Sequence, residues 1–121
     1  MEALMRFRDS VWPILLALAG CGGEYGVPAS HVANARNAIA AAEGAGAAQR
    51  PRADVHLRLA HAELSNARVE LQRGDDRTAD MLLLRAKSDA DLAMALAQEA
   101  SAKREAQNVI DRIKAVTAPQ P

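Results

Sequence analysis

Small and apolar residues recur along the chain at spacings that alternate between three and four, in three separate stretches. This period matches one face of an α-helix, so each stretch is predicted to form an amphipathic helix. The first stretch contains Val32, Ala35, Ile39, Ala42 and Gly46; the second contains Ala53, Leu57, Ala60, Leu64, Ala67 and Leu71; and the third contains Ala79, Leu83, Ala86, Ala90, Ala93, Ala97 and Ala100. The pattern predicts an all-α fold.

Helix-capping residues and helix breakers set the expected ends of the first two helices. Ser30 is the predicted N-cap of the first helix, and Gly44 and Gly46 weaken its end. Pro51 suits the first turn of a new helix and disfavours helix at the residue before it, which predicts a second helix from about Pro51 to Arg73. On the solvent side of that helix, Asp54 and Arg58 are spaced as an i,i+4 ion pair.

The segment from Gly74 to Asp76 reads as a tight turn. Gly74 can take the left-handed conformation that ends a helix. The carboxylates of Asp75 and Asp76 suit the start of the next helix, where they cap free amides and oppose the positive end of the helix dipole. This interpretation is preferred over a metal site at the acidic pair.

The third helix is expected to be long, because no glycine or proline interrupts the chain from Thr78 to Val116. Alanine at the repeating positions lets two backbones approach closely, which predicts an antiparallel alanine-rich hairpin of the second and third helices with the first helix laid against it. Three larger residues lie off the repeating stripe and are candidates to face the first helix, namely Met81, Leu82 and Leu84. The expected fold is therefore a three-helix bundle with a long C-terminal helix.

The lengths of the two hairpin helices predict an overhang. An antiparallel third helix that starts near Asp76 extends beyond the start of the second helix at about Ala97. The part beyond Ala97 is still amphipathic. Its apolar side carries Val109, Ile110, Ile113 and Val116, which are predicted to bind a partner protein or a second copy of the chain. The alternative is that this end frays or bends back.

The first twenty residues are typical of an export signal. Arg6 and Arg8 precede an apolar run at 11–19 that is too short to span a bilayer. The run ends in Leu-Ala-Gly-Cys at 18–21, which resembles the lipobox of bacterial lipoproteins. The resemblance implies cleavage between Gly20 and Cys21 and lipidation of Cys21. A small buried cysteine is the alternative, and either Met1 or Met5 can be the start codon.

The expected division of the chain is a signal peptide at 1–20, a lipidated flexible tether at 21–29, a helical domain at 30–116 and a disordered tail at 117–121. Gly22 follows the cysteine where an aspartate is typical of lipoproteins kept at the inner membrane. The resemblance to lipoproteins thus implies the periplasmic face of the outer membrane in a bacterium with two membranes. Because the chain ends in Gln120 and Pro121 with no terminal lysine, we expect detergent to extract it fully from the cell wall.

Composition argues against several other functions. Removal of 1–20 takes two basic and two acidic residues from the totals of 15 and 15, so the mature chain is neutral at 13 and 13. With Tyr25 as its only aromatic residue, it offers neither the charge nor the stacking surface that nucleic acid requires. His31, His56 and His61 show no zinc spacing, and Asp89 and Asp91 point apart on a helix. No metal, cofactor or catalytic activity is expected.

Residues 30–100 resemble the bacterial lipoprotein family known as domain of unknown function 4398. The resemblance rests on the lipobox, the early alanine-rich helix, the segment from Ala60 to Leu71 followed by Gly74-Asp75, and Ala79, Leu83, Arg85-Ala86 and the stretch 89–93. It implies a short helical envelope domain without catalytic residues. The favoured function is a non-enzymatic structural or interaction lipoprotein, and the alternative is a peptide-binding adaptor resembling a tetratricopeptide hairpin.

Overall fold

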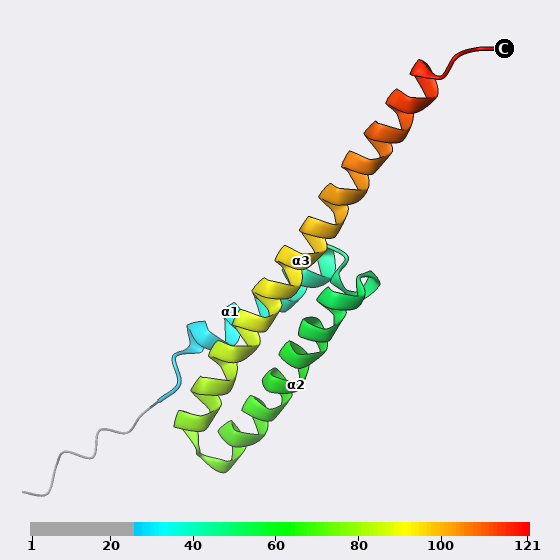
Figure 1. The fold of residues 1–121 in the computed structure, drawn as a ribbon. Helices are drawn as coiled ribbons and strands as arrows, with labels where there is room; N and C mark the ends of the chain where they lie inside the picture. Colours follow the sequence, from blue (N-terminus) through cyan, green and yellow to red (C-terminus); the bar gives the residue numbers. More distant parts are fainter. Residues whose placement is uncertain (1–25) are drawn as a thin grey trace, which may run out of the picture.

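A computed structural model of the chain describes residues 26–121. The described part contains three α-helices and one short 3₁₀ helix, and it has no strand: α1 (Ala29–Gly44), η2 (Ala47–Gln49), α2 (Pro51–Arg73) and α3 (Asp76–Thr117). Figure 1 shows α2 and α3 as an antiparallel hairpin, with α1 beside it and the C-terminal part of α3 extending beyond both. The all-α fold with a long C-terminal helix is therefore confirmed. The predicted cleavage and lipidation residues, Gly20 and Cys21, lie outside the described residues.

The start of α1 differs from the expectation. The helix begins at Ala29, and Pro28 occupies the N-cap position without a side-chain hydrogen bond. The N–H of His31 donates to the Pro28 carbonyl at 2.9 Å, so the first helical bond forms before Ser30 can act as a cap. The prediction of Ser30 as N-cap is wrong, because proline already fixes a backbone angle that suits the entry to the helix.

The connection from α1 to α2 is a tight turn. Gly46 has a φ of 79°, in the left-handed region that glycine adopts without strain. The 3₁₀ turn η2 follows, and Pro51 then takes the first position of α2, where its missing N–H leaves no hydrogen bond unmade. The predicted break at this point and the start of α2 are confirmed.

The turn between α2 and α3 also follows the sequence prediction. Gly74 closes α2 with a φ of 79°. The side chain of Asp75 caps α3, accepting hydrogen bonds from the backbone N–H of Thr78 at 3.0 Å and from its hydroxyl at 2.8 Å. Both interactions hold the carboxylate ionised, so they lower the pKa of Asp75. The hairpin thus turns within two residues.

Alanine dominates the core. The buried apolar positions of α2 and α3 all belong to the repeating stripes: Ala53, Leu57, Ala60, Leu64 and Ala67 on α2, and Ala79, Leu83, Ala86, Ala90, Ala93 and Ala97 on α3. Leu83 is the only large side chain among the described residues that is fully buried. Such small side chains allow the two helix axes to approach closely, which explains how a chain poor in large apolar residues still closes a core.

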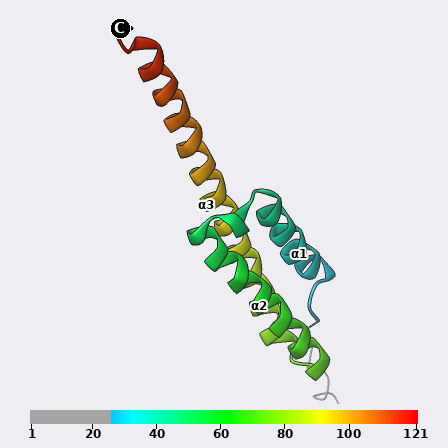
Figure 2. The same cartoon turned by 90° about the vertical axis from the view of Figure 1, so that its right-hand side faces the viewer.

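The helix α1 packs mainly on α3 and less on α2, through its own small buried face of Ala35, Ala38, Ile39 and Ala42. Figure 2, turned by 90° from Figure 1, shows α1 alongside the hairpin and the end of α3 clear of the other helices. The three helices form a bundle over the first half of α3 only.

One packing prediction is wrong. Met81 and Leu84 do not face α1, since 54% and 48% of their surfaces are exposed to solvent. Of the three proposed residues, only Leu82 packs against the core, and it is partly buried. The buried Asp80 on the first turns of α3 instead meets His31 of α1. No helix in the described part of the chain is long and apolar enough to cross a membrane.

Candidate interaction surface

Each pair of helices is joined by one contact between a histidine and a carboxylate. His31 of α1 meets Asp80 of α3. His56 of α2 meets Asp89 of α3 with its Nδ1 atom 2.8 Å from Oδ1, and His61 of α2 meets Glu43 of α1 with Nε2 2.8 Å from Oε1. From the sequence, these histidines show no metal-binding spacing and no expected contact. In the structure all three lie at helix–helix boundaries.

A group of polar side chains surrounds the contact between His56 and Asp89. The carboxyl of Glu63 on α2 lies close enough to Asp89 for burial and the neighbouring negative charge to raise its pKa, while Arg85 on α3 acts in the opposite direction. The Glu63 Oε2 atom is buried without a hydrogen-bond partner among the described residues. The group joins α2 to α3, and the described residues contain no group of three or more side chains able to hold a metal ion.

The most exposed part of the fold is the end of α3. We call residues 102–117 the overhang, and every residue of it is exposed. The last buried position of α3 is Ala97, as the comparison of helix lengths predicted. The four predicted partner-binding residues are exposed large apolar side chains, with exposed fractions of 53% for Val109, 45% for Ile110, 57% for Ile113 and 85% for Val116.

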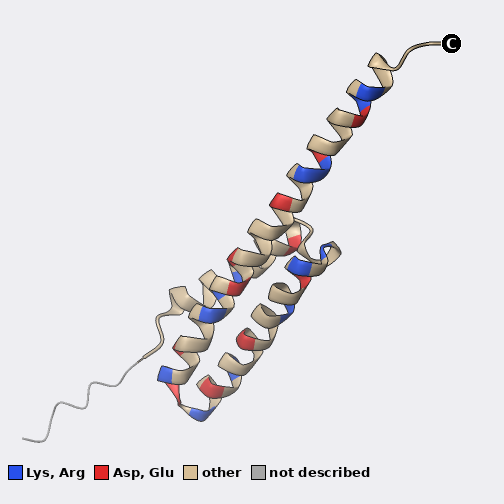
Figure 3. Cartoon of the chain, in the orientation of Figure 1, with Lys and Arg blue, Asp and Glu red and all other residues tan. Residues whose placement is uncertain are grey.

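Charged residues of both signs accompany this apolar stripe, as Figure 3 shows for the extended end of α3. The overhang carries Lys103, Arg104, Glu105, Asp111, Arg112 and Lys114. The side chain of Gln107 donates to Asp111 at 2.9 Å along the helix. An isolated helix of this length is marginal in water, and exposed apolar stripes of this kind mark interaction surfaces.

The apolar stripe of the overhang lies on the opposite side of α3 from the hairpin core. Ala106 follows Ala97 by nine residues, which is about two and a half helical turns. The stripe instead continues the solvent-exposed side of α3 within the bundle. Leu92 precedes Ile110 by 18 residues, about five full turns, so the two side chains lie on one side of the helix.

The exposed side therefore runs along most of α3. Leu84 precedes Ile113 by 29 residues, or about eight turns, and Leu92 is 43% exposed. Between the larger residues lie small exposed ones, Ser88, Ala95 and Ala102. We call this side of α3, from Met81 to Val116, the open face. The sequence pattern does not predict the first half of this face, because it favours Met81 and Leu84 as contacts of α1.

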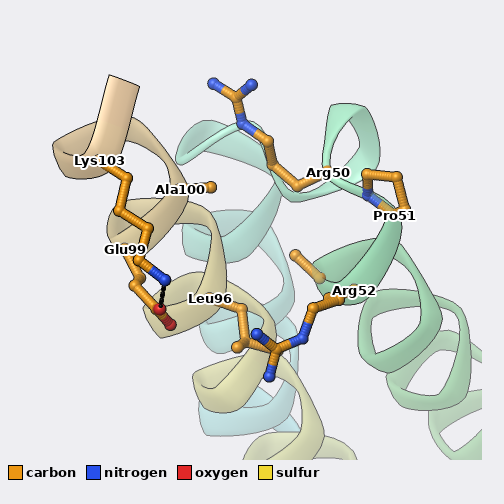
Figure 4. Close-up of a pocket in the computed structure, with 8 residues that line it drawn as sticks. Arg50, Pro51, Arg52, Leu96, Glu99, Ala100 and Lys103 are labelled. Atoms are coloured by element: carbon orange, nitrogen blue, oxygen red, sulfur yellow. Dashed lines mark hydrogen bonds and ion pairs between the residues drawn. The ribbon is translucent and has the colours of Figure 1, made fainter. Parts of the chain in front are cut away.

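A groove of about 300 Å³ lies where the overhang leaves the bundle. Its lining residues are Arg50, Pro51, Arg52 and Ala53 from the start of α2 and Leu96, Glu99, Ala100 and Lys103 from α3. Figure 4 shows Lys103 paired with Glu99 on α3, and Leu96 and Arg52 among the side chains that line the groove. The pair with Lys103 lowers the pKa of Glu99.

Arg50 also reaches Ser101, with its Nη2 atom 3.5 Å from the hydroxyl, so the loop before α2 is attached to α3 at the base of the overhang.

Comparison with protein families matches residues 30–109 to a family described as Domain of unknown function (DUF4398). The matched region starts within the first turn of α1 and ends inside the overhang. Comparisons with curated proteins and with solved structures find no match.

Proposed function

The chain belongs to the DUF4398 family, and from that premise we propose that it is a non-enzymatic, lipid-anchored protein of the cell envelope that binds another protein through the end of α3. The observation that carries this proposal is the overhang. Its apolar stripe stays exposed beyond Ala97, the last position of α3 that is buried in the bundle. A helix that keeps a regular apolar stripe over 16 residues without covering it within its own chain is suited to a partner.

The position of the overhang fits a protein tethered at its other end. His31, near the start of α1, contacts Asp80 near the start of α3, whereas Arg50, after α1 has ended, contacts Ser101. The chain therefore enters the bundle at the end away from the overhang. From Asp80 to Val116 the helix rises about 54 Å at 1.5 Å per residue, so a partner of the overhang would be held far from the point where the tether enters.

Membrane anchoring rests on the sequence. The Leu-Ala-Gly-Cys motif at 18–21 after a short apolar run supports lipidation of Cys21 and export, and Gly22 supports the periplasmic face of the outer membrane. Metabolic labelling with radioactive palmitate tests this part. We expect label on the wild-type chain and none on the Cys21→Ser variant. Absence of label from the wild type, or its persistence in the variant, would remove the lipid anchor from the proposal.

Recovery of partners from detergent-solubilised envelopes tests the role of the overhang. The bait is the full chain, compared with the double variant Ile110→Glu, Ile113→Glu. We expect the variant to lose the proteins that co-purify with the wild type, including a differently tagged copy of the chain, because two charges interrupt the apolar stripe.

A matched control changes the same number of exposed apolar residues elsewhere. Val55 and Leu59 on α2 are each 47% exposed, so Val55→Glu, Leu59→Glu should leave the co-purifying set intact. Recovery of the same proteins by all three baits would show that the overhang does not bind them. Recovery of short peptides alone would favour the adaptor function instead.

A further inference from the structure

We propose that the open face of α3 is a self-association surface on which a second copy of this chain docks in antiparallel orientation. The inference rests on the proposed role of the overhang and deepens it by naming the partner and the alignment. Its starting point is the distribution of exposed apolar residues, which lie on the same side of α3 in both the bundle and the overhang: Met81, Leu84 and Leu92 in the first half, and Val109, Ile110, Ile113 and Val116 in the second.

The bundle leaves room for another helix along this side. The contact of α1 with α3 lies on one flank of the open face, marked by Asp80, and the contact of α2 lies on the other flank, marked by Asp89. These two residues are nine apart, so they point in opposite directions from the helix axis. The open face lies between them and is covered by neither helix, since Leu84, Ser88 and Leu92 are exposed.

The positions of the open face follow the spacing of a coiled coil. One row occurs every seven residues, at Met81, Ser88, Ala95, Ala102, Val109 and Val116. The intermediate row carries two charged residues among its apolar ones, at Arg85, Leu92, Glu99, Ala106 and Ile113. A coiled-coil partner inserts its side chains between these rows. The overhang alone offers little more than two such repeats, too few for a stable pair. The whole open face offers about five heptads. With the residues on its two flanks, such a face approaches the 20 to 30 residues that each side of a standard interface contributes.

Charge decides the direction and alignment of the second copy. With Leu92 of each copy opposite Val109 of the other, Ala95 lies opposite Ala106 and Ser88 opposite Ile113. Residues on the flank toward α1 then meet the same flank of the second copy. Asp91 of each chain, which pairs with Lys87 of its own helix at 2.6 Å, faces Arg112 of the other chain. By symmetry two such ion pairs form.

Other arrangements lack this match. In a parallel pair, a residue on the α1 flank of one copy faces the residue five positions later in the other copy, which lies on the α2 flank. Asp91 then faces Leu96, Glu105 faces Ile110 and Arg112 faces Thr117, so no ion pair forms. Among antiparallel pairs, a shift of one heptad toward longer overlap puts Asp91 beside Glu105. A shift toward shorter overlap puts Glu105 beside its own counterpart.

The antiparallel pair also has a consequence for the tethers. Its twofold axis is perpendicular to the two α3 helices and keeps both copies of α1 on one side of the dimer. The two entry points, next to Asp80 in each copy, lie about 60 Å apart at the rise of 1.5 Å per residue. Both tethers leave from the same side, so a dimer lying along a membrane satisfies two anchors.

Disulfide trapping tests the arrangement in the full 121-residue chain carrying Cys21→Ser, which removes its only thiol. Leu92→Cys and Val109→Cys are made in separate, differently tagged chains. On mild oxidation the mixture should give a disulfide-linked heterodimer, and neither variant alone should give a linked homodimer. Linked homodimers of each single variant would show a parallel pair. The absence of linked product from all three samples would show that the open faces do not pair as proposed. Either result overturns the inference.

A charge exchange tests the ion pairs independently of the apolar contact. Arg112→Asp should weaken dimerisation about tenfold, measured by sedimentation equilibrium. In each of the two symmetric contacts, the new aspartate at position 112 would face the carboxylate of Asp91 in the other chain. The double variant Asp91→Arg, Arg112→Asp should restore the wild-type constant. Equal constants for all three chains, or a double variant weaker than the single one, would contradict the alignment.

A sedimentation series separates this inference from the proposed function. The wild-type chain should sediment as a dimer and Leu92→Glu, Val109→Glu as a monomer, while the α2 control Val55→Glu, Leu59→Glu stays dimeric. A wild-type chain that remains monomeric would overturn self-association alone. Palmitate labelling and recovery of a different envelope protein through the overhang would still decide the proposed function.

Discussion

At the scale of single residues, local spacing predicts burial well and distant pairing poorly. Except for Ala100, which is partly exposed, the alanines of the repeating stripes are buried as expected, because their side of each helix follows directly from the period of 3.6. The contact between His31 and Asp80 joins residues 49 positions apart. No periodic signal connects them, and neither a histidine nor an aspartate indicates its partner by itself. The histidine–carboxylate contacts between helices are therefore visible only once the packing of the helices is known.

Glu63 gives a prediction of how stability depends on pH. Burial and the negative charge of Asp89 raise its pKa in the folded chain above the ordinary value of 4.5. The folded state therefore holds this proton more tightly than the unfolded state. The favourable effect is present below about pH 4.5 and is lost as the pH rises through the folded pKa. Glu63→Gln removes the charge, and the new amide can donate to Asp89, so the variant should be more stable than the wild type at pH 7.

Chemical denaturation at pH 7 and at pH 4 measures this difference. The stability gain of Glu63→Gln should shrink at pH 4, where more of the wild-type carboxyl is protonated. Glu105→Gln, on the exposed overhang, serves as a control and should change little at either pH when the chain is dilute. A gain of equal size at both pH values would show that the effect comes from packing and not from the buried charge.

At the scale of helices, glycine and proline marked the ends more reliably than capping side chains. The turn at Gly74 and the start of α2 at Pro51 both lie where the sequence placed them. Glycine adopts the positive φ of the turn without strain, and proline fixes its own φ and needs no partner for an N–H. The predicted cap at Ser30 failed because Pro28 had already set the entry to α1. Side-chain caps depend on where the helix starts, and that position shifts easily by one or two residues.

Substitution of two glycines by alanine measures the cost of backbone strain without a contribution from steric crowding. A Cβ atom at Gly74 or at Gly44 would meet nothing within 4 Å, but only Gly74 has a positive φ. Gly74→Ala should therefore destabilise the fold by about 1–2 kcal/mol. Gly44→Ala, at the end of α1, should stabilise it by about 0.4–1 kcal/mol, since alanine has less freedom to lose. Urea unfolding of the two variants checks both signs, and destabilisation of similar size by both would show that the φ of Gly74 is not the cause.

At the scale of the whole molecule, the order and direction of the helices followed from the sequence, but the face of α3 that contacts α1 did not. The large apolar residues Met81 and Leu84 suggested a contact with α1. The buried face of α1 is instead mostly alanine, and its His31 contacts the buried Asp80 of α3. Hydrophobicity shows that a residue favours a covered position without showing whether its own chain covers it. The same residues that misled the packing prediction now define the open face.

The final prediction separates folding from association. Every residue from 102 onward is exposed, so the bundle should fold without the overhang. A chain that stops after Ser101 keeps the contact with Arg50 and should match the full chain in unfolding free energy within about 0.5 kcal/mol when both are dilute. At higher concentration the full chain should gain stability, because a dimer stabilises the folded state by mass action, and its thermal midpoint should rise while that of the shortened chain stays constant. Midpoints that remain independent of concentration in both chains would contradict self-association. A large loss of stability in the shortened chain under dilute conditions would instead show that the overhang supports the bundle of its own chain.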